Sequence, residues 1–214
     1  MSSHTPVDNF NRIAARYDRH PGQFGCRRAD TQVLDAAADA MLDAATDARL
    51  AGKDRPPEPT AVLDVGCGTG RLLARAAARW PDATLIGVDP AVEMVRVARQ
   101  RLPNTVLAVA GAEALPLDDG SVDLVLSTTS LGHWIDQTAG CTEIRRVLAP
   151  TGQAVIAEHT PPPGWLKPLL SRFGDLPRHL TEPALRQLLT SAGLRPQRTA
   201  RIRGGLLLVA ASPA

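Results

Sequence analysis

Residues 62–70 read VLDVGCGTG, and this stretch decides the fold. Its first four residues predict a short buried strand, and the three glycines let the backbone turn tightly and approach a ligand. A helix is predicted from Arg71, so its N-terminus offers unpaired N–H groups to the same ligand. The spacing G-x-G-x-G differs from the dinucleotide fingerprint G-x-G-x-x-G, because Arg71 stands where the last glycine belongs. The alternative interpretation is a tight strand-to-helix turn that binds nothing.

The chain after Ala61 alternates short apolar runs with helical patterns. Strands that are apolar almost throughout, separated by amphipathic helices, predict a parallel sheet covered on both faces. The pair Gly204-Gly205 between two late runs predicts a β-hairpin, so at least one strand is expected to run antiparallel. The expected strands are 61–65, 84–88, 105–109, 122–127, 153–158, 194–203 and 206–211, with helices at 71–80, 92–102 and 138–148.

Asp89 makes the ligand interpretation more specific. It ends the second predicted strand, 19 positions after Gly70. An acidic residue at the tip of this strand can accept hydrogen bonds from both ribose hydroxyls of a nucleoside ligand. Because Asp is also a favoured N-cap, the alternative is a cap for the helix that starts near Ala91.

The composition excludes several classes of protein. The 24 Lys and Arg against 22 Asp and Glu give a net charge of +2, which argues against nucleic acid or an anionic membrane as partner. No apolar run approaches the roughly 18 residues of a membrane span, and no signal peptide is visible. Cys26, Cys67 and Cys141 are scattered, as reduced thiols are, and form neither a disulfide framework nor a zinc pattern. We therefore expect a cytoplasmic protein.

Several motifs in order resemble the class I methyltransferases that use S-adenosylmethionine (SAM), in particular the small-molecule group of ubiquinone and menaquinone biosynthesis. The resemblance implies a Rossmann-like, doubly wound α/β fold with six parallel strands and one antiparallel strand. It also implies an N-terminal helical lid over the sheet's carboxyl edge. The matching stretches are FNRIAARYD (10–18), VLDVGCGTG (62–70), GVDPAVEMVRVAR (87–99), AGAEALPLDDGSVDLVLS (110–127), RRVLAPTG (145–152) and TEPALRQLLTSAGL (181–194).

The organisation along the chain follows from composition and from this resemblance. Residues 27–50 are rich in Ala and Asp and favour helix. Residues 51–60 (AGKDRPPEPT) are charged and Pro-rich, as linkers are. We expect a lid and linker over residues 1–60 and a SAM-binding domain over residues 61–214, in one compact unit.

The resemblance implies roles for the matched positions. Gly66, Cys67 and Gly68 would approach the methionine part of SAM, and Asp64 would hold that loop and the amino group. Asp89 would bind the ribose. The other cofactor-binding positions implied are Tyr17, Pro90, Met94, Gly111, Ala112, Glu113, Ser127 and Thr128.

The chain departs from the family pattern at two positions. Gly111 stands where the family has Asp, so the adenine amine loses one acceptor, which Glu113 or a water is expected to replace. Thr151 stands where Gly is usual and is expected to affect only the local backbone of a turn.

Two histidines are candidates for a catalytic base. His133 follows the fourth strand, where a neutral imidazole beside the methyl group can take a proton from a hydroxyl or amine. His159 follows the fifth strand at the same edge. The alternative for both is a histidine that only shapes the pocket. His4, His20 and His179 are expected on the surface or in the lid. No metal site is expected, since neither H-x-x-H nor H-E-x-x-H spacing occurs.

The chain has three Trp, one Tyr and three Phe, and all but Trp80 lie in the N-terminal segment or after the fourth and fifth strands. Aromatic walls suit a flat apolar substrate, and also a sulfonium through cation–π attraction. The alternative is an apolar cluster under the lid. The predicted substrate-pocket residues are Phe10, Phe24, Trp134, Trp165 and Phe173.

The leading hypothesis is a SAM-dependent methyltransferase of a small, aromatic or partly apolar metabolite, acting as a monomer or homodimer and producing S-adenosylhomocysteine (SAH). Methyl transfer needs mainly alignment and exclusion of water, so no fixed catalytic triad is expected. The alternative is a protein of the same fold that binds SAM or SAH without methylating. A nicotinamide oxidoreductase is disfavoured, since Tyr17 has no partner in a Tyr-x-x-x-Lys pattern. A nucleic-acid methyltransferase is disfavoured by the absence of a basic stripe and of a base-binding motif.

Overall fold

The computed structural model describes residues 6–19, 23–52, 56–162, 164 and 178–214, with the side chains of all of these except residues 6 and 23–27. The helices are α1 (Pro6–Ile13), α2 (Gln23–Leu50), α3 (Arg71–Arg79), α4 (Val92–Arg101), α5 (Gln137–Val147) and α7 (Glu182–Ser191), with short 3-10 helices η1 (Ala14–Arg19), η2 (Leu131–His133) and η5 (Arg203–Gly205). The strands are β1 (Ala61–Val65), β2 (Thr84–Asp89), β3 (Val106–Val109), β4 (Val122–Thr128), β5 (Leu148–His159), β6 (Leu194–Ile202) and β7 (Leu206–Pro213).

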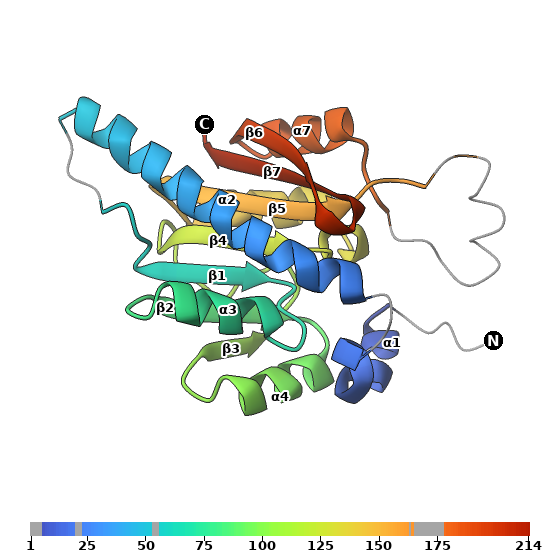
Figure 1. Ribbon diagram of the computed structural model, residues 1–214. Helices are drawn as coiled ribbons and strands as arrows, with labels where there is room; N and C mark the ends of the chain where they lie inside the picture. The colour runs from blue at the N-terminus through green and yellow to red at the C-terminus, as the bar shows by residue number, and fades with distance from the viewer. Residues whose placement is uncertain (1–5, 20–22, 53–55, 163, 165–177) are drawn as a thin grey trace.

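Within the described residues the strands form one seven-stranded sheet in the order β3-β2-β1-β4-β5-β7-β6 (Figure 1). Strands β1 to β5 pair in parallel, and β7 runs antiparallel to both of its neighbours, β5 and β6. The predicted Rossmann-like fold with one antiparallel strand is confirmed. The strand order reverses between β1 and β4, and open α/β sheets bind ligands at the carboxyl ends of the strands at such a point.

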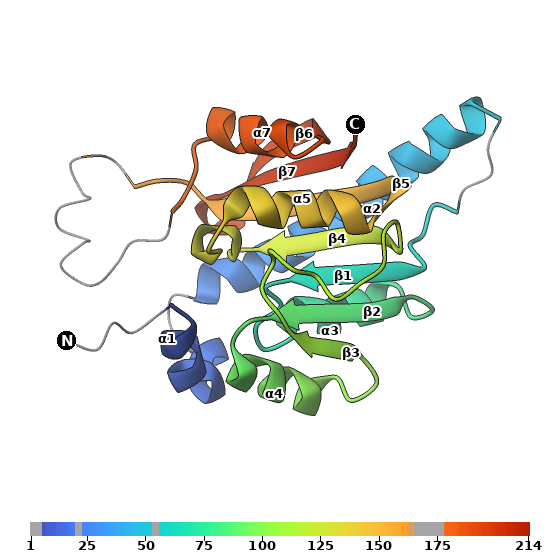
Figure 2. The ribbon, with the colours of Figure 1, turned by 180° about the vertical axis from the view of Figure 1, so that it is seen from behind.

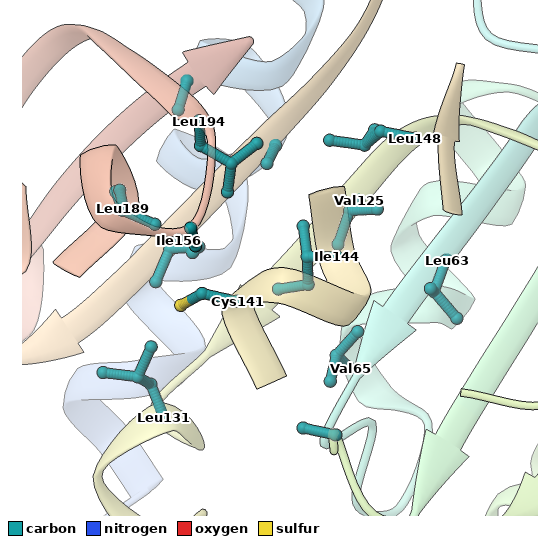
Figure 3. Packing of buried hydrophobic residues seen from close by; sticks show 14 of the residues in the cluster. Leu63, Val65, Val125, Leu131, Cys141, Ile144, Leu148, Ile156, Leu189 and Leu194 are labelled. Carbon is teal, nitrogen blue, oxygen red and sulfur yellow. The ribbon is translucent and has the colours of Figure 1, made fainter. Parts of the chain in front are cut away.

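Helices cover both faces of the sheet (Figures 1 and 2). Val62 and Leu124 belong to the buried cluster beneath α2 and α3. Their chain neighbours Leu63 and Val125 belong to the opposite cluster, with Ile144 of α5 (Figure 3). Because side chains alternate along a strand, a sheet buried on both faces needs apolar residues at consecutive positions.

The largest boundary difference concerns β5, which begins at Leu148 and not at Gln153. Val122 pairs with Leu148, and a register shift then brings Leu124 opposite Gln153. The expected turn before the fifth strand is therefore part of the strand. Thr151 lies there without a positive φ, so its departure from Gly causes no backbone strain.

The β6–β7 hairpin is closed by Gly204 and Gly205, which have φ angles of 81° and 72°. Glycine adopts such angles at little cost, and two of them in a row give the twist that a tight hairpin needs. The antiparallel strand predicted from this glycine pair is confirmed.

The N-terminal helices occupy two places. The long helix α2 packs across the sheet and is part of the layered core. In contrast, α1 and η1 lie beside α4 at the end of the sheet to which the β1 and β4 arrows point (Figure 1). The expected lid is therefore α1 and η1, and the division at residue 60 stays a prediction. None of the described helices is long and apolar enough to cross a membrane.

Candidate functional site

A cavity at the carboxyl edge is bounded by the loop after β1, the ends of β2 and β4, and the lid. It is lined by every residue that was predicted to bind the cofactor except Ser127, namely Tyr17, Asp64, Gly66, Cys67, Gly68, Asp89, Pro90, Met94, Gly111, Ala112, Glu113 and Thr128. Phe10, His133 and Trp134 line it as well. The remaining lining residues were not among the predicted site residues, and they are Val7, Asp30, Thr69, Arg71, Leu72, Thr129, Ser130 and Ile135.

The glycine loop after β1 is held by β2 and by the turn after β4. Gly66 N–H donates to the carbonyl of Val88 (2.8 Å), and Gly68 N–H donates to Asp89 Oδ2 (2.9 Å). Gly66 has a φ of 76°, and a Cβ on it would stand 2.3 Å from Ser130 Cβ. Only glycine fits here, so the loop presents bare backbone to the cavity.

Asp89 accepts hydrogen bonds from two backbone N–H groups, and its contact with a ribose stays a prediction. Its Oδ2 accepts from Gly68, while Oδ1 accepts from Ala91 N–H (2.8 Å) at the start of α4. Burial raises the pKa of Asp89, and these two amide hydrogen bonds oppose the shift. The loop contact that the structure shows is thus made by Asp89, and the role of Asp64 in holding the loop stays a prediction. A carboxylate has lone pairs left for ligand hydroxyls.

Three buried carboxylates, those of Asp30, Asp64 and Asp89, line the cavity. Burial raises the pKa of Asp64 to about 8, and the neighbouring charges of Asp30 and Asp89 contribute further. Asp30 is paired with Arg71 Nε at 2.9 Å and Arg75 Nε at 3.4 Å. Because buried like charges repel, a cationic ligand would stabilise this arrangement.

Glu113 occupies the space that a side chain at Gly111 would need. A Cβ on Gly111 would lie 2.6 Å from Glu113 Oε2. The other oxygen, Oε1, accepts from the N–H groups of Ile135 (2.7 Å) and Asp136 (3.1 Å). The missing Asp of the family pattern and the placement of Glu113 are thus linked, since the two carboxylates would compete for one place.

A network of hydroxyl groups fixes Trp134. Ser130 Oγ donates to the carbonyl of Val65 (2.9 Å) and accepts from Trp134 Nε1 (3.2 Å). Ser127 Oγ lies 2.9 Å from Ser130 Oγ and is the donor, because the single hydroxyl hydrogen of Ser130 is used. Ser127 is buried and does not line the cavity, contrary to expectation. It supports the wall from behind.

The turn after β4 is strained and polar. Thr129 has a φ of 53°, an outlier for a β-branched residue, and its N–H donates to the carbonyl of Ala157 (2.8 Å). Thr128 lines the cavity, and its buried Oγ1 has no hydrogen-bond partner among the described residues. Backbone strain is retained where it serves a ligand or a reaction. An unpaired buried hydroxyl in the same turn is consistent with ligand contact.

His133 lines the cavity and faces the lid. Its ring centroid lies 5.0 Å from that of Phe10, with the rings nearly perpendicular. Burial lowers the pKa of His133, and the charge of Glu158 opposes this shift. The imidazole is therefore neutral at pH 7 and able to accept a proton.

The structure separates His159 and His179 from the cavity. His159 does not line it and packs against His179, with ring centroids 5.5 Å apart. His179 is not the surface or lid residue that was expected, because its side chain is 14% exposed and its Nδ1 lies 3.5 Å from Glu158 Oε1. His4 and His20 lie outside the described residues.

Apart from Trp80 at the end of α3, the aromatic side chains of the described part lie around the lid and the turn after β4. Phe10 and Tyr17 stand 6.1 Å apart between ring centroids. Trp134 is 7% exposed and packs against Gly140, where a Cβ would come within 2.5 Å of the indole. The predicted pocket residues that lie outside the description are Trp165, Phe173 and the side chain of Phe24.

Polar contacts dock the lid onto the glycine loop. Asp18 of η1 forms an ion pair with Arg101 and accepts from Thr69 Oγ1 (2.9 Å). Burial raises the pKa of Asp18, but the contacts with Arg101 and Thr69 outweigh burial and lower this pKa overall. Asn11 Oδ1 accepts from Glu93 N–H (3.0 Å) at the start of α4. The lid therefore contacts the glycine loop directly, through Asp18 and Thr69.

Comparison with known proteins gives a consistent result. A family model described as a methyltransferase domain matches residues 62–152. An uncharacterized methyltransferase of Mycobacterium tuberculosis is 40% identical over 125 residues, which are 56% of this chain and 50% of the relative. The demethylmenaquinone methyltransferase of Thermus thermophilus is 34% identical over 160 residues, 72% of this chain and 66% of that protein. The chain thus spans about half the length of the mycobacterial relative.

Solved structures share the fold. A complex between the Haloferax volcanii Trm112 methyltransferase activator and a methyltransferase matches with a TM-score of 0.69 and 21% identity, over 99% of both chains. The [4+2]-cyclase SpnF matches with a TM-score of 0.61 and 19% identity, over 72% of this chain and 74% of that chain. At these identities the likeness shows the fold alone. The family model, the relatives and the fold agree, and the chain belongs to the class I SAM-dependent methyltransferases, in the group that resembles the enzymes of ubiquinone and menaquinone biosynthesis.

Proposed function

We propose that this protein transfers a methyl group from SAM to a small, aromatic or partly apolar metabolite. The observation that carries the proposal is a single cavity lined by the glycine loop, by Asp89 and by His133. When bound, SAM supplies an electrophilic methyl group on a positively charged sulfur. The protein then has to hold the cofactor, place the acceptor and exclude water.

The cavity residues fit this cofactor. The buried carboxylates of Asp30, Asp64 and Asp89 suit a ligand that carries an ammonium and a sulfonium. Asp89 would accept hydrogen bonds from the ribose, and Asp64 would face the amino group. Glu113 Oε2, beside Gly111, would replace the missing Asp as acceptor for the adenine amine. The remaining adenine contacts would come from Pro90, Met94 and Ala112.

The acceptor would lie on the side of the cavity where the lid meets the turn after β4. Val7 and Phe10 of α1 and Ile135 give this side an apolar surface. The neutral imidazole of His133 would take the proton that an acceptor hydroxyl or amine loses. Thr128 Oγ1, which has no partner among the described residues, would hydrogen-bond a polar group of the acceptor.

Calorimetry with SAH, followed by methyl transfer from isotope-labelled SAM, tests the proposal. The acceptor panel should contain phenols, carboxylic acids, aliphatic amines and quinone precursors, with product masses read by mass spectrometry. Labelled product with a flat aromatic acceptor would support the function. Transfer only to charged aliphatic acceptors would contradict the proposed substrate class.

The second candidate is a protein of this fold that binds SAM or SAH without methylating. SpnF shows that the fold also supports a cyclase. Tight SAH binding without turnover on any acceptor class would favour this candidate. The docked imidazole of His133 beside an apolar surface favours a reaction in the cavity, whichever class it belongs to.

Replacing Asp89 with Ala is expected to weaken SAM binding by about 1.5–3 kcal/mol, the usual loss for hydrogen bonds to a charged group. The Gly68 amide also loses its acceptor, so the loop loosens. Calorimetry on the purified variant measures the effect. Asp89→Asn is the companion variant: it keeps the shape and one acceptor oxygen, but it removes the charge and replaces the second acceptor with an NH2 donor. Unchanged affinity in Asp89→Ala would leave this residue with its helix-capping role alone.

Binding of SAH is expected to slow hydrogen exchange in residues 8–19, because a ligand beneath the lid adds contacts to Phe10 and Tyr17. Ordering a short, already anchored segment costs little entropy, so the ligand contacts offset it. Asp18→Asn removes the charge that pairs with Arg101 and should speed exchange in the unliganded protein. Equal protection with and without SAH would mean a permanently docked lid.

A further inference from the structure

Glu158 is a buried carboxylate at the end of β5 that no step proposed above uses. It is 3% exposed, and its two oxygens accept from the N–H groups of Gly132 (Oε2, 3.0 Å) and His159 (Oε1, 2.7 Å). Removing a carboxylate from water is costly, and an apolar side chain of similar size would often stabilise a fold as well or better. The charge at this position therefore calls for a role other than stability.

Three groups lie against this carboxylate, namely His179 and the amides of Gly132 and His159. Nδ1 of His179 lies 3.5 Å from Glu158 Oε1. Although burial raises it, the pKa of Glu158 is lowered overall by His179 and by the amides of Gly132 and His159. A negative charge is thus present beneath the turn after β4 at neutral pH.

That turn carries the proposed base. Gly132 directly precedes His133, so the hydrogen bond to Glu158 fixes the backbone next to the imidazole. Arg178 clamps the turn from the other side: its N–H donates to the carbonyl of Gly132 (2.9 Å), and its guanidinium donates to the carbonyl of Ile135 (2.7 Å). Glu158 and Arg178 therefore both hold this turn, on the side of the cavity where the methyl acceptor would lie.

We propose that Glu158 is a positioning residue for the acceptor side of the cavity, which fixes the turn at residues 131–135 and strengthens His133 as a base. The catalytic meaning of this proposal rests on the proposed function. Three titratable groups act on the imidazole, namely Glu158, His159 and His179, and only the first of these three is an anion. Arg178 reaches the same turn but donates to its carbonyls. Glu158 therefore offsets the burial that would otherwise weaken the base.

The test is a titration of the His133 ring by NMR in the full chain saturated with SAH, which needs no turnover. His133→Gln identifies the resonance. Glu158→Gln removes the charge and is expected to lower the pKa of His133 by about 0.5–1 unit. Glu158→Asp keeps the charge and should hold that pKa within about 0.3 unit of the wild type. Glu58→Gln, an exposed carboxylate before β1, is the matched control and should change nothing.

Measurements of kcat and KM distinguish the effect of the position of the Glu158 carboxylate from the effect of its charge. Glu158→Asp draws the carboxylate away from Gly132 and is expected to lower kcat about 10–100-fold while the KM for SAM stays the same. The apparent pKa at which kcat rises with pH should fall only in Glu158→Gln. A purely structural residue would not separate the two variants in this way.

Several results would overturn the proposal. These are an unchanged pKa of His133 in Glu158→Gln, an equal fall in both variants, or full turnover in Glu158→Asp. If Glu158→Gln does not fold, the kcat of Glu158→Asp still decides whether Glu158 positions the turn. If the wild type methylates no acceptor, the proposed function fails, but the titration still decides whether Glu158 sets the proton affinity of His133.

Discussion

His133→Ala is expected to lower kcat for methyl transfer about 10²–10⁴-fold and to leave the affinity for SAM nearly unchanged. The imidazole lines the cavity and packs against Phe10 of the lid. Losing it removes the group that takes the acceptor proton. His159→Ala is the matched comparison, since that ring lies outside the cavity wall. Its effect should stay below about tenfold.

The pH dependence of the rate gives an independent reading of the same residue. A free imidazole has a pKa of about 6.5, and burial lowers the pKa of His133 below that value. A positive sulfonium nearby would lower it further. The rate of the wild type should therefore rise through an apparent pKa below about 6.5 and be level at pH 7 and above. A variant that keeps full turnover and the same profile would remove His133 from the chemistry.

Raising the pH from 5 to 8 is expected to lower the free energy of unfolding of the unliganded protein by about 3.5 kcal/mol through Asp64. An unfolded Asp has a pKa of about 3.9, and burial raises the pKa of Asp64 to about 8. The folded state holds the extra proton across this range. The stability from Asp64 is therefore complete below about pH 4 and is lost as the pH rises through about 8.

Denaturant unfolding of the wild type and Asp64→Asn at several pH values isolates this contribution. Asp89 acts with the same sign, and the lowered pKa values of His133 and His159 act with the opposite sign. The wild type and Asp64→Asn share all of these groups. The difference between their free energies of unfolding at each pH is therefore the contribution of Asp64. The Asn variant should be the more stable at pH 8. Parallel curves would contradict the assignment.

A cationic ligand should lower the pKa of Asp64, which burial raises. SAM binding is expected to release about one proton at pH 7, and the affinity should rise with pH up to about 8. Calorimetry in buffers of different ionisation enthalpy counts the proton. Asp64→Asn should release none, and SAH, which lacks the sulfonium charge, should release less than SAM.

The positions of the strands along the chain and the place of the ligand loop could be predicted from the sequence because both depend on local patterns. Apolar runs of strand length between helical patterns define β1 to β4 to within about two residues. Gly204 and Gly205 determine the hairpin through their own backbone angles. Asp89 stands at the tip of its strand at a spacing that local structure dictates.

The partners of the candidate site could not be predicted, because they depend on how distant elements pack. Asp30 reaches the cavity only through the docking of α2, and Ser130 supports Gly66 only because β4 lies beside β1. The contact between Asp89 and the loop was missed for the same reason, since the amide of Gly68 faces β2.

The sequence by itself determined the fold class, the antiparallel last strand, the glycine loop and the identity of the residues around it, since periodicity and spacing along one chain suffice for these. Only the tertiary structure decided what surrounds His133. Glu158 and His159 are neighbours on β5, and consecutive side chains of a strand point to opposite sides. Sheet geometry therefore brought the carboxylate beneath the turn after β4 and left His159 outside the cavity, although both follow the same apolar run.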